Sequence, residues 1–139
     1  MENFVFHTPT KILFGKGQTG NLAEQIKAFG GHRVLMVYGG GSIKKSGLYD
    51  IVVQNLKQNG IDFRELSGIQ PNPRISSVRE GIAICKKDEL DFVLPVGGGS
   101  TIDAAKAIAA GVHYNGDPWD FFMRKTRVEQ ALPVGTILT

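Results

Sequence analysis

The chain has 139 residues, of which 42% are hydrophobic and 21% charged, so we expect one domain that buries roughly two-thirds of the surface exposed on unfolding. Its 16 basic and 13 acidic residues give a net charge of +3 and are spread along the sequence, which argues against a nucleic-acid-binding face. The single cysteine excludes an intramolecular disulfide, and neither a signal peptide nor an apolar run of about 18 residues is present, so we expect a cytoplasmic protein without membrane association.

Two short strands are predicted at the N-terminus. Residues 3–6 and 11–14 are rich in aromatic and branched side chains and flank a Thr-Pro-Thr turn, which indicates a β appendage. Because the outer edge of such a strand is open and apolar, we expect another copy of the chain to cover it in a homodimer. After the appendage, Leu22, Ile26 and Phe29 recur at helical spacing before a Gly-Gly pair, which predicts a helix.

The central part of the chain alternates apolar runs with amphipathic segments. The run RVLMVY at 33–38 is apolar almost throughout, as expected for a strand buried on both faces of a parallel sheet. Strands are predicted at 33–38, 62–66, 92–96 and 131–139, and helices at 48–58, 75–87 and 100–110. Because no hairpin joins the core strands, crossover connections are required, and the predicted fold class is α/β with a parallel sheet flanked by helices.

The strongest motif is the loop of Gly97, Gly98, Gly99 and Ser100, between a predicted buried strand and a helix. Glycines let the backbone approach an oxygen-rich ligand, and the first amides of a helix lie at the positive end of its dipole. This loop is therefore predicted to hold a pyrophosphate. Ile102 occupies the place of the third glycine in G-x-G-x-x-G, and no Gly-Lys-Ser/Thr follows, so an ordinary dinucleotide fingerprint and a nucleoside triphosphatase are both disfavoured.

A purely structural role is the alternative for this loop. Ser100 and Asp103 have the spacing of a capping box, and the glycines would then form only a tight turn. Capping and ligand binding are compatible, since Ser100 can satisfy one helix amide while Gly98 and Gly99 leave theirs to a phosphate. A pyrophosphate would repel Asp103, so we expect this carboxylate to cap the helix or to contact a hydroxyl.

A second loop, formed by Gly39, Gly40, Gly41 and Ser42, follows the neighbouring strand. In dinucleotide sites this position contacts the adenine ribose, and NAD enzymes commonly place Asp or Glu there. Here no carboxylate is present, whereas amides, a serine hydroxyl and two following lysines suit a 2′-phosphate. The loop predicts NADP in preference to NAD, and a surface turn with solvated lysines is the alternative.

No metal site is predicted within this chain. His7, His32 and His113 stand in separate segments without the spacing of metal ligands. Cys85 is on the inward face of a predicted helix, which favours a buried thiol over a nucleophile. The aromatic segment 119–122 either packs against the core or lines a substrate cleft.

Six motifs occur in order along the whole chain: TPTKILFGKG, YGGGSIKKSG, QPNP, PVGGGSTIDAAKAIA, GDPWDF and ALPVGTILT. Together they resemble the iron-containing alcohol dehydrogenases, in particular their bacterial butanol dehydrogenase branch. The resemblance implies that residues 1–139 form a Rossmann-like, dehydroquinate synthase-like NAD(P)-binding domain. In the family a helical domain follows and supplies one Asp and three His to Fe²⁺ or Zn²⁺, and a small alcohol or aldehyde binds between the two domains.

The resemblance also implies roles for individual residues. Gly98, Gly99 and Ser100 would hold the pyrophosphate, the loop 39–42 the adenosine ribose, and Asn72 and Thr139 the adenine side. In the family mechanism the metal polarises the substrate oxygen while hydride moves between the carbinol carbon and nicotinamide. The sequence ends where the family continues toward its metal-bearing helices, so this fragment alone is expected to lack catalytic and metal-binding residues and to be inactive.

Two other functions remain open at this point. One is a stand-alone nucleotide-binding module without catalysis. The other is a related metal enzyme, such as a glycerol dehydrogenase or dehydroquinate synthase relative. The GDPWDF and YGGGS segments favour the alcohol dehydrogenases.

Overall fold

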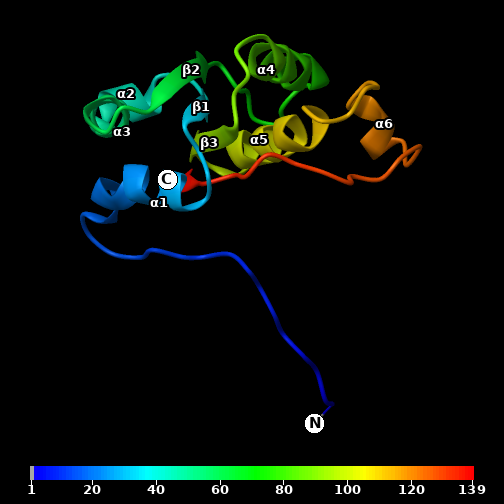
Figure 1. The fold of residues 1–139 in the computed structure, drawn as a ribbon, viewed down its shortest axis with the longest axis horizontal. Coiled ribbons are helices and arrows are strands. Elements are labelled where there is room, and N and C mark those ends of the chain that lie inside the picture. The colour runs from blue at the N-terminus through cyan, green and yellow to red at the C-terminus, as the bar shows by residue number, and fades with distance from the viewer. Residues whose placement is uncertain (1) are drawn as a thin grey trace.

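The computed structural model describes residues 2–139 and contains a four-stranded sheet in the order β2-β1-β3-β4 (Figure 1). All three strand pairings are parallel, so the predicted α/β fold class is confirmed. The strands are β1 (Arg33–Tyr38), β2 (Asp62–Leu66), β3 (Phe92–Gly97) and β4 (Ile137–Leu138), and the helices are η1 (Gln18–Asn21), α1 (Leu22–Ala28), α2 (Ser42–Lys45), α3 (Leu48–Gln58), α4 (Ile75–Lys87), α5 (Gly99–Gly111) and α6 (Trp119–Phe122).

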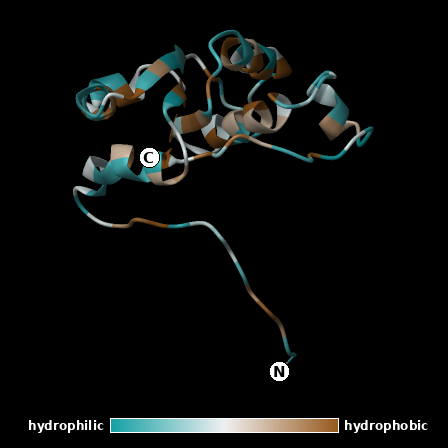
Figure 2. Ribbon diagram, viewed as in Figure 1, coloured by the Kyte–Doolittle hydropathy of each residue, from teal (hydrophilic) through white to brown (hydrophobic). Residues whose placement is uncertain are grey.

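The central strand β1 is buried on both faces, which explains its continuous apolar sequence. Leu35 and Val37 pack into a cluster with α4 and α5, whereas Val34 and Met36 pack into a second cluster with α1 and α3. Side chains alternate between the two faces of a strand, so one apolar run supplies both cores. Figure 2 shows hydrophobic and hydrophilic residues alternating within α4, as expected for a helix with one face on the sheet.

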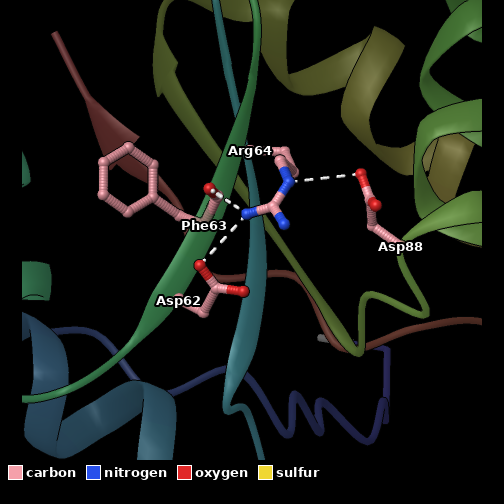
Figure 3. Close-up of polar contacts among 4 residues, drawn as sticks. All are labelled: Asp62, Phe63, Arg64 and Asp88. Atoms are coloured by element: carbon pink, nitrogen blue, oxygen red, sulfur yellow. Dashed lines mark hydrogen bonds and ion pairs between the residues drawn. The ribbon is translucent and has the colours of Figure 1, made fainter.

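Charged residues occupy β2, the strand at one edge of the sheet. The Arg64 Nε donates to Asp88 at the end of α4 at 3.2 Å, and its NH1 donates to Asp62 at 3.0 Å (Figure 3). The bond to Asp88 ties the edge strand to the helix that follows it, whereas the bond to Asp62 lies within β2. Charged side chains on an edge strand also discourage pairing with other chains.

The N-terminal β appendage predicted at 3–6 and 11–14 is not formed. Residues 2–14 run as an extended segment away from the sheet (Figure 1) and have no strand partner within residues 2–139. Phe4, Val5 and Phe14 are 84%, 96% and 95% exposed. Composition identified residues suited to a strand, but a strand also needs a neighbour with which to form its hydrogen-bonded ladder.

The predicted C-terminal strand is much shorter than 131–139. Only Ile137–Leu138 pair with β3, and Val134 forms an isolated bridge with Val93. Pro133 has no N–H to donate, although its carbonyl accepts from Val93 at 3.0 Å. The other predicted boundaries agree with the structure, except that β3 extends to Gly97 and α5 spans Gly99–Gly111 in place of 100–110. Within residues 2–139, no helix combines the length and hydropathy needed to cross a bilayer.

Candidate functional site

Both predicted glycine loops lie at the carboxyl edge of the sheet. Tyr38 of β1 is in register with Val96 of β3, so the loops that follow these strands begin side by side. A pocket of about 260 Å³ lies between them, lined by Gly40, Ile69, Pro71, Gly98, Gly99, Ser100 and Thr101. The structure therefore brings both glycine loops and the QPNP segment to one place, which is where ligands bind in open parallel sheets.

Helix α5 directs free amides toward this pocket. Gly98 precedes the helix with an extended backbone, and the first hydrogen bond of the turn runs from the Ile102 N–H to the Gly98 carbonyl at 3.1 Å. The amides of Gly99, Ser100 and Thr101 consequently have no carbonyl four residues back within the helix. A 13-residue helix with free amides and the positive end of its dipole at a pocket is suited to an anionic group.

The three consecutive glycines have different reasons to be glycine. A Cβ built on Gly98 or Gly99 meets no heavy atom within 4 Å, so the pocket side of this backbone is open. A Cβ on Gly97 would lie 2.8 Å from Oγ1 of the buried Thr101. Gly97 thus permits the chain to turn against α5, while Gly98 and Gly99 leave space in which a ligand can approach the backbone.

The capping box proposed as an alternative is not formed. Gly98 is the N-cap residue of α5, which places Ser100 inside the helix, and no side chain makes a capping hydrogen bond. The expectation that Asp103 caps the helix is therefore wrong. Asp103 instead lines a second pocket of about 160 Å³, most of whose lining is apolar and includes Trp119 and Phe122.

The loop after β1 contributes one glycine to the larger pocket. Gly40 lines the pocket, whereas Gly39 does not. The Gly39 carbonyl accepts a hydrogen bond from the Gly68 N–H at 2.8 Å. Gly41 precedes the short helix α2, and the exposed Ser42 begins it. All four residues lie at the carboxyl end of β1, but only Gly40 is part of the pocket lining.

Asn72 and Thr139 lie beside the pocket without lining it. Asn72 is exposed between two prolines with φ +55°, a left-handed conformation that asparagine tolerates better than most residues. This backbone geometry is sufficient reason for an asparagine at this position. The Thr139 N–H donates to the Gly97 carbonyl at 3.1 Å, which places it at the base of the glycine loop.

Sequence reasoning missed three residues of the pocket lining: Ile69, Pro71 and Thr101. Pro71 lies in the QPNP motif, whose rigidity was a detectable signal. The Ile69 N–H donates to the Tyr38 carbonyl at 3.2 Å, a contact across the sheet that cannot be inferred from local sequence. The sequence places Thr101 in a helix but does not show that it is buried. Its burial follows from the turn at Gly97, which packs against the Thr101 side chain.

A cluster of aromatic and charged side chains lies at the same end of β1. The Lys44 Nζ is 5.6 Å from the ring centroid of Tyr38 and 4.9 Å from that of Tyr49. A hydrogen bond to the Glu65 carboxylate, together with desolvation and the charge of Glu65, raises the pKa of Tyr49 to about 12. Tyr49 therefore stays neutral at physiological pH.

Two further predictions concern metal and thiol chemistry. Within residues 2–139, no three or more His, Cys, Asp or Glu side chains group together as metal ligands. Cys85 is buried, as predicted, and desolvation raises the pKa of its thiol to about 12. This thiol is consequently a packing group of the α4 and α5 core.

Residues 9–139 match the family model described as iron-containing alcohol dehydrogenase. The chain is 55% identical over 139 residues to the probable NADH-dependent butanol dehydrogenase 2 of Bacillus subtilis, covering 100% of this chain and 35% of that protein. It is 44% identical over 142 residues to the NADPH-dependent aldehyde reductase YqhD of Escherichia coli, covering 100% of the chain and 36% of the reductase. The crystal structure of NADH-dependent butanol dehydrogenase A from Thermotoga maritima superposes with a TM-score of 0.96 and 54% identity, over 100% of this chain and 35% of that one. The chain thus spans about 35% of the length of these relatives.

Proposed function

The chain belongs to the iron-containing alcohol dehydrogenase family, and we propose that residues 1–139 are the NAD(P)-binding domain of a butanol dehydrogenase-like enzyme. That enzyme would transfer hydride between NAD(P)H and a primary alcohol or aldehyde. The names of the relatives support this activity, since they are butanol dehydrogenases and an aldehyde reductase. A helical domain outside these residues would complete the enzyme and supply the ligands for Fe²⁺ or Zn²⁺.

The observation that carries the proposal is the pocket between the two glycine loops. Its open glycine backbone and the free amides of α5 fit the pyrophosphate of a dinucleotide. The residues proposed to hold the cofactor are Gly97, Gly98, Gly99 and Ser100 at the pyrophosphate, Gly39, Gly40, Gly41 and Ser42 at the adenosine ribose, Asn72 and Thr139 on the adenine side, and Asp103 at a hydroxyl. Bound nicotinamide would supply the hydride chemistry, while these residues bind and orient the cofactor.

The residues described do not fit a metal centre, because they contain no group of three or more potential ligands. A metal in this family acts as a Lewis acid only when several fixed ligands hold it. We therefore propose that residues 2–139 are inactive alone. Purified chain supplied with Fe²⁺ or Zn²⁺, NADP⁺ and butanol is expected to form no NADPH, and metal-dependent turnover would refute this part of the proposal.

NADP(H) is the proposed cofactor in preference to NAD(H). Residues 39–42 provide amides and a hydroxyl but no carboxylate to accept hydrogen bonds from the ribose hydroxyls of NAD. Relatives named for either cofactor match the chain, so family membership alone does not decide between them. Gly39→Asp would bring a carboxylate to this loop, with its Cβ 3.3 Å from the Ile69 carbonyl oxygen, and should shift the ratio of NADPH to NADH affinity toward NADH.

We also propose that the protein is a cytoplasmic homodimer. The support for a dimer is the extended N-terminal segment, whose apolar residues Phe4, Val5, Ile12 and Phe14 are all more than three-quarters exposed. Pairing this segment with a second copy would satisfy its backbone and cover those side chains. Sedimentation of the full-length protein should give a dimer at micromolar concentration. A monomer with residues 2–14 ordered would contradict the proposal.

A fluorescence titration tests the binding function. NADPH added to the 139-residue chain should show saturable enhancement of its emission, and unlabelled NADP⁺ should displace it. NADH is expected to bind more weakly. The proposed function fails if neither dinucleotide binds to chain that circular dichroism shows to be folded.

A further inference from the structure

Lys44 presents a fixed positive charge beside the glycine loop after β1. Its ammonium lies over two aromatic rings, 4.9 Å from the centroid of Tyr49 and 5.6 Å from that of Tyr38. The rings pack edge to face with centroids 5.8 Å apart. Tyr38 is 3% exposed, so the support beneath the lysine is part of the protein core.

The two rings hold the ammonium without neutralising it. Aromatic faces attract a cation through their quadrupole but carry no net charge. No Asp or Glu oxygen within residues 2–139 comes within 4.0 Å of the Lys44 ammonium. Glu65, whose interaction with the Tyr49 hydroxyl raises the pKa of Tyr49, forms no ion pair with Lys44. Among the described residues the Lys44 ammonium therefore has no ion-pair partner, and its N–H groups are available to an anion.

The position of this charge corresponds to a particular part of the cofactor. Tyr38 directly precedes Gly39, and Lys44 follows Ser42 by two residues, so the lysine and the glycine loop share the carboxyl end of β1. This is where a dinucleotide site contacts the adenine ribose. The neighbouring Lys45 makes no aromatic contact within the described chain. Geometry therefore distinguishes two lysines that are equivalent in the sequence.

We propose that Lys44, positioned by the rings of Tyr38 and Tyr49, pairs with the 2′-phosphate of NADP(H) and selects it over NAD(H). This inference rests on the proposed dinucleotide site. A lysine free in solvent must lose rotamer freedom when it binds a phosphate, whereas a lysine already held over two rings has lost much of it. The ion pair then contributes to NADPH affinity and nothing to NADH affinity, because NADH has no 2′-phosphate.

The test compares Lys44→Met with the matched control Lys45→Met in the 139-residue chain. Methionine keeps an unbranched stem and removes the charge. Lys44→Met should weaken binding of NADPH and of 2′,5′-ADP roughly tenfold, while affinities for NADH and 5′-AMP stay within about twofold. Lys45→Met should change the NADPH affinity by less than about threefold. Circular dichroism of each variant verifies the fold.

Tyr49 is a positioning residue in this proposal, and its variants separate the ring from the hydroxyl. Tyr49→Phe retains an aromatic face and should keep the preference for NADPH, whereas Tyr49→Leu should lose much of it with NADH binding unchanged. Equal NADPH affinity of Lys44→Met and the unmodified chain would overturn the role of Lys44 and leave the dinucleotide site standing. If the unmodified chain binds neither NADPH nor NADH, the proposed function fails and the role of Lys44 fails with it.

Discussion

Replacing Gly99 with valine separates cofactor binding from folding more cleanly than any other change in the glycine loop. Gly99 is the first residue of α5, it does not have a positive φ, and a Cβ there meets no protein atom within 4 Å. A β-branched residue strains the backbone at a positive φ, which Gly99 does not have, so valine is not expected to strain this turn. Valine also has a better helix propensity than glycine, so the free energy of unfolding should hold or rise slightly.

The same side chain should block the cofactor, because the branched carbons would occupy the space through which a pyrophosphate reaches the α5 amides. Losing two hydrogen bonds to a charged group costs about 3 kcal/mol, or roughly a hundredfold in Kd. Fluorescence titration with NADPH measures the loss, and thermal unfolding followed by circular dichroism measures stability. Gly20→Val is the matched control, since Gly20 also has open space and an ordinary φ but lies in η1. Unchanged NADPH affinity in folded Gly99→Val would refute the placement of the pyrophosphate.

Gly97→Ala should lower the melting temperature, because its Cβ would meet a buried threonine hydroxyl at 2.8 Å; a cost of about 1–3 kcal/mol is expected, and an unchanged melting temperature would show that the turn can relax. Asp117 links α4 to α6, because its carboxylate accepts hydrogen bonds from the Arg79 guanidinium and the Trp119 amide. These bonds hold the pKa of Asp117 below its usual range. The link is therefore complete above the ordinary carboxyl pKa and is lost as pH falls through the lowered pKa. Emission of Trp119, the only tryptophan, should report that transition, and Arg79→Gln should move it to higher pH; a midpoint unaffected by Arg79→Gln would contradict the cause assigned here. Cys85 should not react with a thiol reagent at pH 8 until denaturant is added, and rapid labelling of the native protein would show that the thiol is not buried.

The strands that could be predicted are those whose apolar sequence reflects burial in the sheet. β1 and β3 are continuous apolar runs because helices cover both faces of the sheet, and their positions agree with prediction within one residue. Residues 3–6 have a comparable composition but no strand partner within residues 2–139, so composition alone does not make them a strand of this sheet. A segment forms a strand only when a second segment pairs with it, and the local sequence does not show whether such a segment is present.

The candidate site was predictable to the same extent and for a similar reason. Glycine loops after buried strands indicate an open backbone, and Gly98 and Gly99 do line a pocket. Their contact with a pyrophosphate stays a prediction. The spacing of Ser100 and Asp103 suggested a capping box with Ser100 as the N-cap, but the N-cap is Gly98, two residues earlier, so the box is not formed. The stacking of Lys44 on Tyr38 and Tyr49 joins residues from three elements, and only the folded chain reveals it.

The most direct test of the central claim is an amide-resolved NMR titration of the isotopically labelled chain with NADP⁺. The largest chemical-shift changes should fall on Gly98, Gly99 and Ser100, with further changes at Gly40 and in the α2 segment that contains Lys44. Dinucleotide binding at the pocket between the glycine loops would be contradicted if these amides were unmoved while NADP⁺ saturated another surface, or if no resonance moved at all.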